Sequence, residues 1–313
     1  MNERPAVTGL MQRLIIVSLT WLSCLNWLSP AQAAETATDA PPRGALYEVS
    51  DGRHTLLLFG TIHVGAPDFY PLEPRLRQAL AAAPVLALEL DPQNTAAMQE
   101  AVQRHGLYPP GQHLLDQLAP PLRQRTMATL QRLGLPEQGV QNLRPWMLAL
   151  ALTVQEYARH GYQSALAVDS HLAASVRAHG GQILELESAE RQMHLFSQLN
   201  DAQQVQFLDD TLKELQDSQL NRRIDTLVDA WRHADSTGLA GALRELQEDD
   251  SFTSRFTLKN LLQDRNPGLA TGIAALLRRQ DKAVAGIGIL HLTGPDSVPA
   301  LLAKQGLQIR QLY

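Results

Sequence analysis

Two short passages near opposite ends of the chain share one pattern, which constrains the fold more than any other feature. Residues 55–65 read TLLLFGTIHVG, and residues 282–294 read KAVAGIGILHLTG. Each is an apolar run typical of a buried strand, followed by Gly-x-x-His and then a glycine that indicates a tight turn. Open α/β sheets bind ligands at the carboxyl ends of their strands. We therefore expect His63 and His291 to frame one site at the end of a sheet.

The remaining pattern predicts an α/β fold. Asp51-Gly52 lies between apolar runs at 45–49 and 54–59 and is a strong hairpin signal. Further strands are expected at 85–90, 182–186, 282–289 and 307–312. Helical patterns cover about 73–83, 93–105, 120–133, 145–160, 165–179, 188–199, 201–217, 221–234, 238–248, 254–280 and 295–304.

The order of these elements indicates how they assemble. The strand, helix and strand at the end of the chain have the spacing of a parallel crossover. We predict a mixed, mostly parallel sheet built from N- and C-terminal segments, with a large helical insert over about 93–280.

The first residues have the pattern of a secretory signal peptide. Arg4 and Arg13 precede an apolar stretch over 14–28, and Ala31-Gln-Ala33 fits a small-x-small cleavage site. The apolar stretch is shorter than the ~20 residues of a comfortable membrane span, so an uncleaved anchor is the less favoured alternative.

Three segments follow from this reading: a signal peptide over 1–33, a flexible polar leader over 34–44 and one domain over 45–313. We expect cleavage near Ala33 and a periplasmic or secreted protein with no stable membrane span after cleavage.

Composition excludes several classes of function. The formal net charge is −5, and no basic, aromatic-rich patch is present, which argues against nucleic-acid binding. The single cysteine, Cys24, lies inside the predicted signal peptide. The mature protein would therefore have no disulfide, thiolate metal ligand or cysteine nucleophile.

No local catalytic signature is present. His-Glu-x-x-His, Gly-x-Ser-x-Gly and the Walker loop are all absent. Catalysis would have to use dispersed residues, and the candidates are His63, Glu89, Glu187 and His291. Histidine and carboxylate suit Zn²⁺, Mn²⁺ or Co²⁺ with an open position for water, although spacing alone does not show a metal. Glu89, inside an apolar run, is expected either at the sheet rim or buried and paired.

Several passages together resemble the TraB/GumN family, which is related to the Tiki metalloproteases and more remotely to the erythromycin-esterase and ChaN-like fold. The resemblance runs from about Leu46 to the end of the chain. The matching passages are 58–65, 85–91, 144–147, 168–172, 184–188 with Gln192, 265–266 and 288–294.

This resemblance implies a divalent metal (Mn, Co or Zn) held by His63, Glu89 and His291. It also implies hydrolysis of a peptide bond in a peptide or protein substrate, with Glu89 as a ligand or as the general base. One position departs from the family pattern. Leu290 stands where the family usually has glycine before the histidine, and leucine does not easily adopt a positive φ.

Other residues have two interpretations. Glu187 and Arg265 are expected to line the site, where Arg265 would hold a substrate carboxylate or stabilise an oxyanion. The alternative is a buried Arg–Glu pair that ties the helical insert to the sheet. Asp169 is expected to act as a first-turn helix acid, and Asn266 as a turn residue before Pro267.

Two other classes of function remain open. A non-catalytic protein that binds haem, metal or peptide is the main alternative to the metal-dependent hydrolase. An esterase, or another hydrolase of small molecules, is the third, because a fold does not by itself decide a function.

Overall fold

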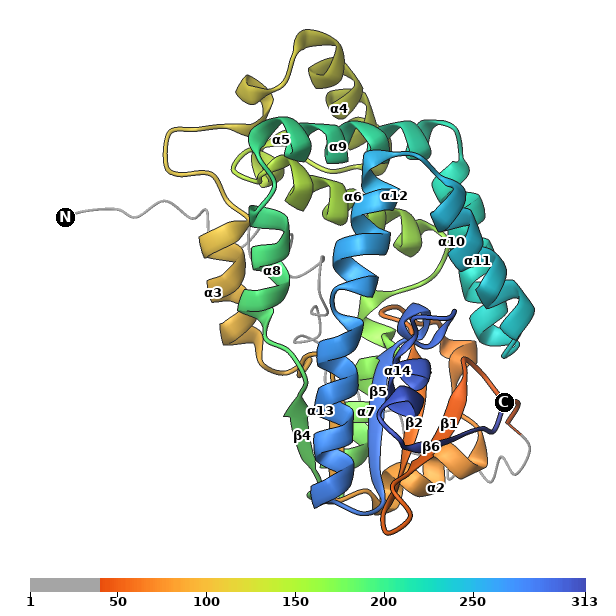
Figure 1. Ribbon diagram of the computed structural model, residues 1–313. Coiled ribbons are helices and arrows are strands. Elements are labelled where there is room, and N and C mark those ends of the chain that lie inside the picture. Colours follow the sequence, from red (N-terminus) through yellow and green to blue (C-terminus); the bar gives the residue numbers. More distant parts are fainter. Residues whose placement is uncertain (1–39) are drawn as a thin grey trace, which may run out of the picture.

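The computed structural model describes residues 40–313, and its base is a six-stranded mixed sheet (Figure 1). The order across the sheet is β4-β3-β5-β2-β1-β6. The strands are β1 (Leu46–Ser50), β2 (Thr55–Thr61), β3 (Val85–Leu88), β4 (Gln182–Glu185), β5 (Ala283–Gly288) and β6 (Gln308–Gln311).

Strand β5 lies at the centre of the sheet. It pairs in parallel with β2 on one side and with β3 on the other. Its sequence AVAGIG has no charged or polar side chain, as expected for a parallel strand that is covered on both faces. Strand β1 pairs antiparallel with both β2 and β6, so the remaining five strands share one direction. The predicted fold class is confirmed, and β6 runs in the same direction as β5, as the crossover spacing predicts.

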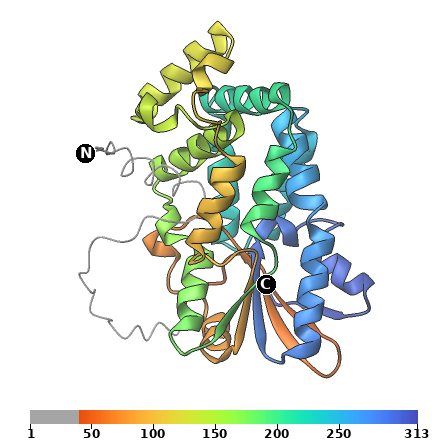
Figure 2. The ribbon, with the colours of Figure 1, turned by 90° about the vertical axis from the view of Figure 1, so that its left-hand side faces the viewer.

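Helices surround the sheet and extend far beyond one end of it. They are α2 (Pro74–Ala82), α3 (Thr95–His105), α4 (Pro120–Leu133), α5 (Glu137–Val140), α6 (Pro145–Arg159), α7 (Val168–Arg177), α8 (Ala189–Ser197), α9 (Asp201–Gln216), α10 (Gln219–Arg232), α11 (Ser236–Glu248), α12 (Phe252–Phe256), α13 (Asn266–Arg279) and α14 (Val298–Lys304). Figure 2 shows α7 and α13 on opposite faces of the sheet, with α4 and α9 at the far end of the molecule.

One predicted helix is wrong as a single element. The α-helical pattern over 254–280 is divided into α12, a π-helix (Thr257–Gln263) and α13. Arg265 precedes α13, and Pro267 lies in its first turn, where proline needs no hydrogen-bond donor. π-Helical turns widen a helix and are frequent at functional sites. This break places Arg265 between the helical insert and the sheet.

Two tryptophans fill the core. Trp231 on α10 is fully buried and donates a hydrogen bond from Nε1 to the carbonyl of Gly60, at 2.8 Å. Trp146 on α6 stacks on Phe196 of α8, with ring centroids 4.7 Å apart. The Trp231 bond attaches the helical insert directly to the end of β2.

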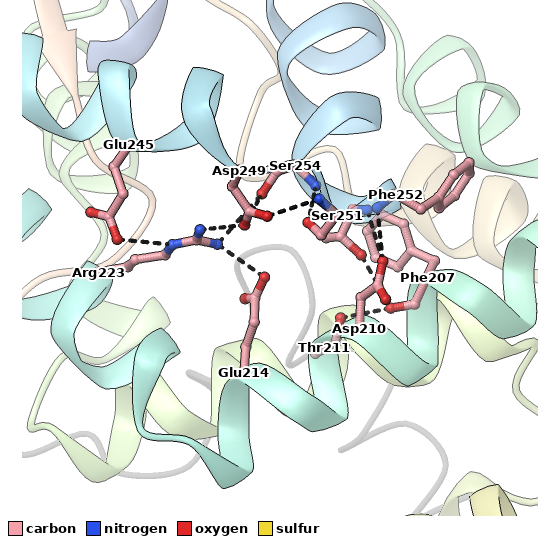
Figure 3. A network of polar contacts seen from close by, with 11 residues as sticks. Phe207, Asp210, Thr211, Glu214, Arg223, Glu245, Asp249, Ser251, Phe252 and Ser254 are labelled. Atoms are coloured by element: carbon pink, nitrogen blue, oxygen red, sulfur yellow. Dashed lines mark hydrogen bonds and ion pairs between the residues drawn. The ribbon is translucent and has the colours of Figure 1, made fainter.

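Arg223 links three consecutive helices of the insert and the turn before α12 (Figure 3). From α10 it donates to Glu214 on α9 at 2.9 Å and to Glu245 on α11 at 3.3 Å, and it also pairs with Asp249 before α12. Asp210 on α9 accepts the N–H of Phe252, at 2.9 Å, in the first turn of α12. These contacts fix the start of α12, which leads into the π-helix.

The predicted signal peptide and most of the predicted leader, residues 1–39, lie outside the described residues. The last part of the leader makes contacts with the body of the protein, since Arg43 donates to the carbonyl of Asp68 at 2.8 Å. Within residues 40–313, no helix combines the length and apolar character that crossing a membrane requires.

Candidate functional site

Three neighbouring strands bring the predicted site residues together. His63 follows β2, Glu89 follows β3, and His291 follows β5 within a short 3₁₀ helix (Ile289–Leu292). These strands are parallel, so their carboxyl ends meet at one end of the sheet. A cavity of about 360 Å³ opens there, and all three residues line it.

Gly288 lies at the centre of this group. A Cβ atom at this position would stand 3.3 Å from Glu89 Oε1, 3.6 Å from His63 Nε2 and 3.6 Å from His291 Cδ2. The φ of Gly288 is −52°, a value open to any residue, so a side chain here would not strain the backbone. It would instead occupy the space between the three residues. The three predicted ligands therefore surround one small volume.

His63 is oriented from behind by a buried carboxylate. Its Nδ1 donates to Asp169 Oδ2 at 2.9 Å, and the Thr61 hydroxyl donates to the other oxygen of Asp169 at 2.7 Å. The side chain of His63 is 59% exposed because it faces the open cavity. Desolvation opposes its protonation, but Asp169 and Glu89 outweigh this and raise the pKa of His63 to about 9.

His291 is oriented in the same way by an amide. Its Nδ1 lies 2.6 Å from Asn266 Oδ1, while the Asn266 amide nitrogen donates to the carbonyl of Asp296 at 2.8 Å. The second bond fixes the amide orientation, so Oδ1 is the acceptor and His291 carries its proton on Nδ1. Burial lowers the pKa of His291 to about 4, which leaves Nε2 with a bare lone pair at neutral pH.

Glu89 is buried, and each oxygen of its carboxylate has a partner. Its Oε1 accepts the Gly288 N–H at 2.7 Å, and its Oε2 pairs with the guanidinium of Arg265. Burial alone would raise the pKa of Glu89, but the charge of Arg265 more than offsets it and keeps that pKa far below its usual value. Glu89 therefore stays ionised and is a poor proton acceptor.

Arg265 also holds Glu187, the other carboxylate predicted for the site. Its Nε donates to Glu187 Oε2 at 3.0 Å, and Gln192 donates to the same oxygen at 2.9 Å. Arg265 lines the cavity, whereas Glu187 is not among the lining residues. The buried Arg–Glu arrangement considered from the sequence is thus present, and it ties the helical insert to the sheet.

The donor chemistry fits a divalent cation. Nε2 of His291 lies 3.9 Å from Glu89 Oε1, so a lone pair faces an ionised carboxylate, an arrangement that a cation between them would stabilise. Both histidines have Nδ1 bonded to an oxygen acceptor, which is the usual arrangement behind metal-binding imidazoles. As the side chains stand, no group of three or more His, Cys, Asp or Glu in the described part of the chain is spaced to hold a metal. Binding would therefore need side-chain adjustment.

The residue that departs from the family pattern causes no backbone strain. Leu290 lies in the 3₁₀ helix before His291 and is not among the residues with positive φ. Leucine is therefore compatible with this backbone. Gly294 supplies the expected turn, with φ of 89°.

Two residues of this site were assigned other roles from the sequence. Asp169 lies in the first turn of α7, as expected, but its carboxylate also binds His63. Asn266 begins α13 and binds His291, so it is more than the turn residue that was expected. Each lies inside a passage that resembles the family, 168–172 and 265–266, and this was the one signal that could have pointed to them.

Comparison with known proteins identifies the family of this chain. The sequence profile described as the TraB/PrgY/gumN family matches residues 45–311, nearly all of the described chain. The chain belongs to the TraB/PrgY/gumN family. Both Gly-x-x-His passages fall inside the match, as do Glu89, Asp169 and Asn266.

Relatives within this family are distant. The uncharacterized protein YbaP of Escherichia coli K12 is 23% identical over 251 residues, which cover 80% of this chain and 89% of YbaP. YbaP of Shigella flexneri is 24% identical over 250 residues, covering 80% and 88%. No solved structure matches the chain significantly. The comparisons therefore show the family, and the activity has to be argued from the site.

Proposed function

We propose that this protein is a metal-dependent hydrolase that cleaves a peptide or amide bond. The observation that carries the proposal is the orientation of the two histidines. Asp169 and Asn266 each bind an Nδ1 atom, which directs Nε2 of each histidine away from these partners. Nε2 of His291 has its lone pair near Glu89, and Nε2 of His63 would bind a metal after losing its proton. His63, His291 and Glu89 would hold the metal, which would supply a Lewis acid and lower the pKa of bound water.

The other residues would act on the substrate and on the ligands. Arg265 keeps Glu89 ionised, which favours Glu89 as a ligand over Glu89 as the general base. The guanidinium also lines the cavity, where its charge would stabilise an oxyanion. Glu187 would act as a positioning residue, because it contacts Arg265 and not the cavity.

The first test is metal content together with hydrolysis. Purified protein would be loaded with Mn²⁺, Co²⁺ or Zn²⁺ and assayed on a mixture of peptides by mass spectrometry. His63→Ala and His291→Ala should each lose most of the bound metal and all of the hydrolysis. His233→Ala is a matched control, because His233 ends α10 and bonds to the backbone of Asp229. Wild-type protein that binds none of the three metals would refute the proposal.

A binding protein without catalysis is the second candidate. It is favoured by the pairing of Glu89 with both Gly288 and Arg265, which leaves this carboxylate less available to a metal. Such a protein would bind metal, haem or a peptide without turnover. Metal or peptide binding with no hydrolysis across the peptide mixture would support this candidate, and haem binding would be read from its absorbance.

We also propose a periplasmic or secreted location and removal of residues 1–33. This rests on the sequence of those residues alone. Cell fractionation followed by N-terminal sequencing tests it, and a mature chain that begins at or near Ala34 is the expected result. A cytoplasmic chain that begins at Met1 would refute it.

A further inference from the structure

The walls of the cavity are apolar although its floor is charged. The floor consists of the strand ends with His63, Glu89 and His291. The walls come mostly from elements of the helical insert. The apolar side chains that these elements contribute are Met98 of α3, Val154 and Tyr157 of α6, Leu227 of α10, and Leu261 and Leu262 of the π-helix.

The apolar wall side chains are partly removed from water. Val154, Tyr157, Leu227 and Leu261 are half-buried, and burial raises the pKa of Tyr157 to about 12. A charged ligand group placed against these side chains would lose hydration and gain no ionic partner from them. An apolar group would instead be removed from water, which is favourable in proportion to its area.

The charges that line the cavity are already engaged. Arg265 is paired with Glu89 and Glu187. Of the other lining carboxylates, Asp169 is bonded to His63, Asp91 pairs with Arg177, and Glu185 accepts the N–H of Asp91 at 2.9 Å. The charged groups lie mostly at or just after the strand ends, so selectivity for a side chain above them falls to the apolar walls.

The size of the cavity limits what enters it. A volume of about 360 Å³ lies at the lower end of the range for ligand sites. It suits one large side chain with its adjoining backbone and excludes a folded domain. A peptide would therefore enter as an extended or flexible segment.

We propose that the helical insert selects a peptide segment with a large apolar side chain, such as Leu or Phe, beside the bond at the floor. The peptide class of this ligand rests on the proposed function, whereas the preference for an apolar side chain rests on the residues of the walls. Binding itself needs no metal and no turnover. Leu227, Val154 and Leu261 are the specificity-determining residues.

Binding of capped pentapeptides, acetyl-Ala-Ala-X-Ala-Ala-amide, tests this proposal without catalysis. X would be Ala, Val, Thr, Leu, Asn, Phe, Lys or Asp, so that Leu and Asn, and Val and Thr, are pairs of similar shape. Affinity would be measured by calorimetry, or by NMR titration of the protein where binding is weak. We expect about fourfold tighter binding for each added buried methylene, with Leu and Phe the tightest.

A protein variant locates the binding. Leu227→Asn should weaken the Leu peptide by about tenfold and leave the Ala peptide nearly unchanged. Met127→Asn is the control, because Met127 is 45% exposed on α4 and does not line the cavity. Circular dichroism would show that both variants are folded. If Leu227→Asn does not fold, the rank order of peptides on the wild-type protein remains the decisive measurement.

The outcomes separate this proposal from the proposed function. Apolar preference without cleavage would refute the hydrolase and support the selectivity. Cleavage without apolar preference would support the hydrolase and refute the selectivity. Four results would each overturn the apolar peptide proposal. Three are equal affinities across the series, a preference for Lys or Asp, and no detectable binding of any peptide at its solubility limit. The fourth is tighter binding of octanamide, an apolar amide that is not a peptide, than of any peptide.

Discussion

Asn266 and His291 are joined by a 2.6 Å hydrogen bond that determines which histidine nitrogen faces the cavity. The amide of Asn266 is held in turn by the carbonyl of Asp296. This chain of contacts keeps the proton of His291 on Nδ1, which is the less common tautomer of free histidine. The helical insert and the end of β5 thus cooperate in presenting one lone pair.

Replacing Asn266 should release this orientation. In Asn266→Ala, His291 loses its acceptor, and metal affinity should fall by about 10- to 100-fold. Long-range ¹H–¹⁵N NMR of the metal-free protein should show the Nδ1–H form in wild type and a mixture of tautomers in the variant. Asn221→Ala on α10 is the control, because Asn221 does not line the cavity. An unchanged tautomer in Asn266→Ala would contradict the assignment.

Gly288 offers a way to fill the space between the ligands. Gly288→Ala places a methyl group beside Glu89 Oε1 and both histidines without straining the backbone, since φ is −52°. We expect metal binding to be lost while the free energy of unfolding changes by less than about 1 kcal/mol. Full metal affinity in this variant would mean that the metal lies elsewhere.

The equivalent glycine of the first passage behaves differently. A Cβ at Gly60 would overlap the side chain of Ile289, so Gly60→Ala should destabilise the fold, by about 1–3 kcal/mol. Urea unfolding of the two variants side by side separates the effect on packing from the effect on the site.

Arg265 should be worth more to stability than any exposed arginine. In Arg265→Met, the buried carboxylates of Glu89 and Glu187 lose their partner, and we expect a loss of about 3–5 kcal/mol. Arg310→Met breaks an ion pair with Glu48 in which the arginine side chain is 68% exposed, and it should cost less than about 1 kcal/mol. Equal losses in the two variants would show that the Arg265 cluster is not a structural requirement.

His171 should make stability depend on pH. It stacks on Tyr70, with centroids 4.1 Å apart, and burial lowers its pKa to about 4 from 6.5. The unfolded chain then binds the proton more readily, so this contribution is complete above pH 6.5 and is lost as the pH falls towards 4. His171→Phe keeps an aromatic ring but takes up no proton. As the pH falls from 6.5 to 4, its free energy of unfolding should decrease by on the order of 2 kcal/mol less than that of the wild type. Parallel profiles for wild type and variant, from urea unfolding, would contradict this prediction.

Arg223 should stabilise the elements that lead to the π-helix. Arg223→Met leaves Glu214 and Asp249 without their shared cation, so hydrogen exchange should speed up in α12 and in residues 257–263. Its neighbour Arg222 is exposed and donates a hydrogen bond to the carbonyl of Asp217, so Arg222→Met is the matched control. The same exchange pattern in both variants would show that the network of Figure 3 does not support the π-helix.

Local patterns were sufficient to predict the strands and the end of the sheet at which three candidate site residues lie. Alternating and continuous apolar runs identified β2, β3 and β5, and parallel strands bring their ends together wherever they lie in the chain. His63, Glu89 and His291 could therefore be placed at one end of the sheet before any contact was known.

Contacts between distant segments could not be predicted in this way. Asp169 and His63 are 106 residues apart, and nothing near either residue specifies the other. The π-helix was missed because the apolar positions of 257–263 also fit an α-helix. Gly65 was expected to make a tight turn, but a side chain there would overlap the backbone of Leu166, so its role is close packing.

The central position of β5 also affects how the chain can fold during synthesis. Strands β2 and β3 leave the ribosome early, but each lacks its shared partner β5 until residues 283–288 arrive between them. Until then the chain carries two unpaired strand edges, while the helices of the insert can form from local contacts. Such late pairing of distant segments gives slow folding, and the floor of the cavity first exists once β5 has joined the sheet.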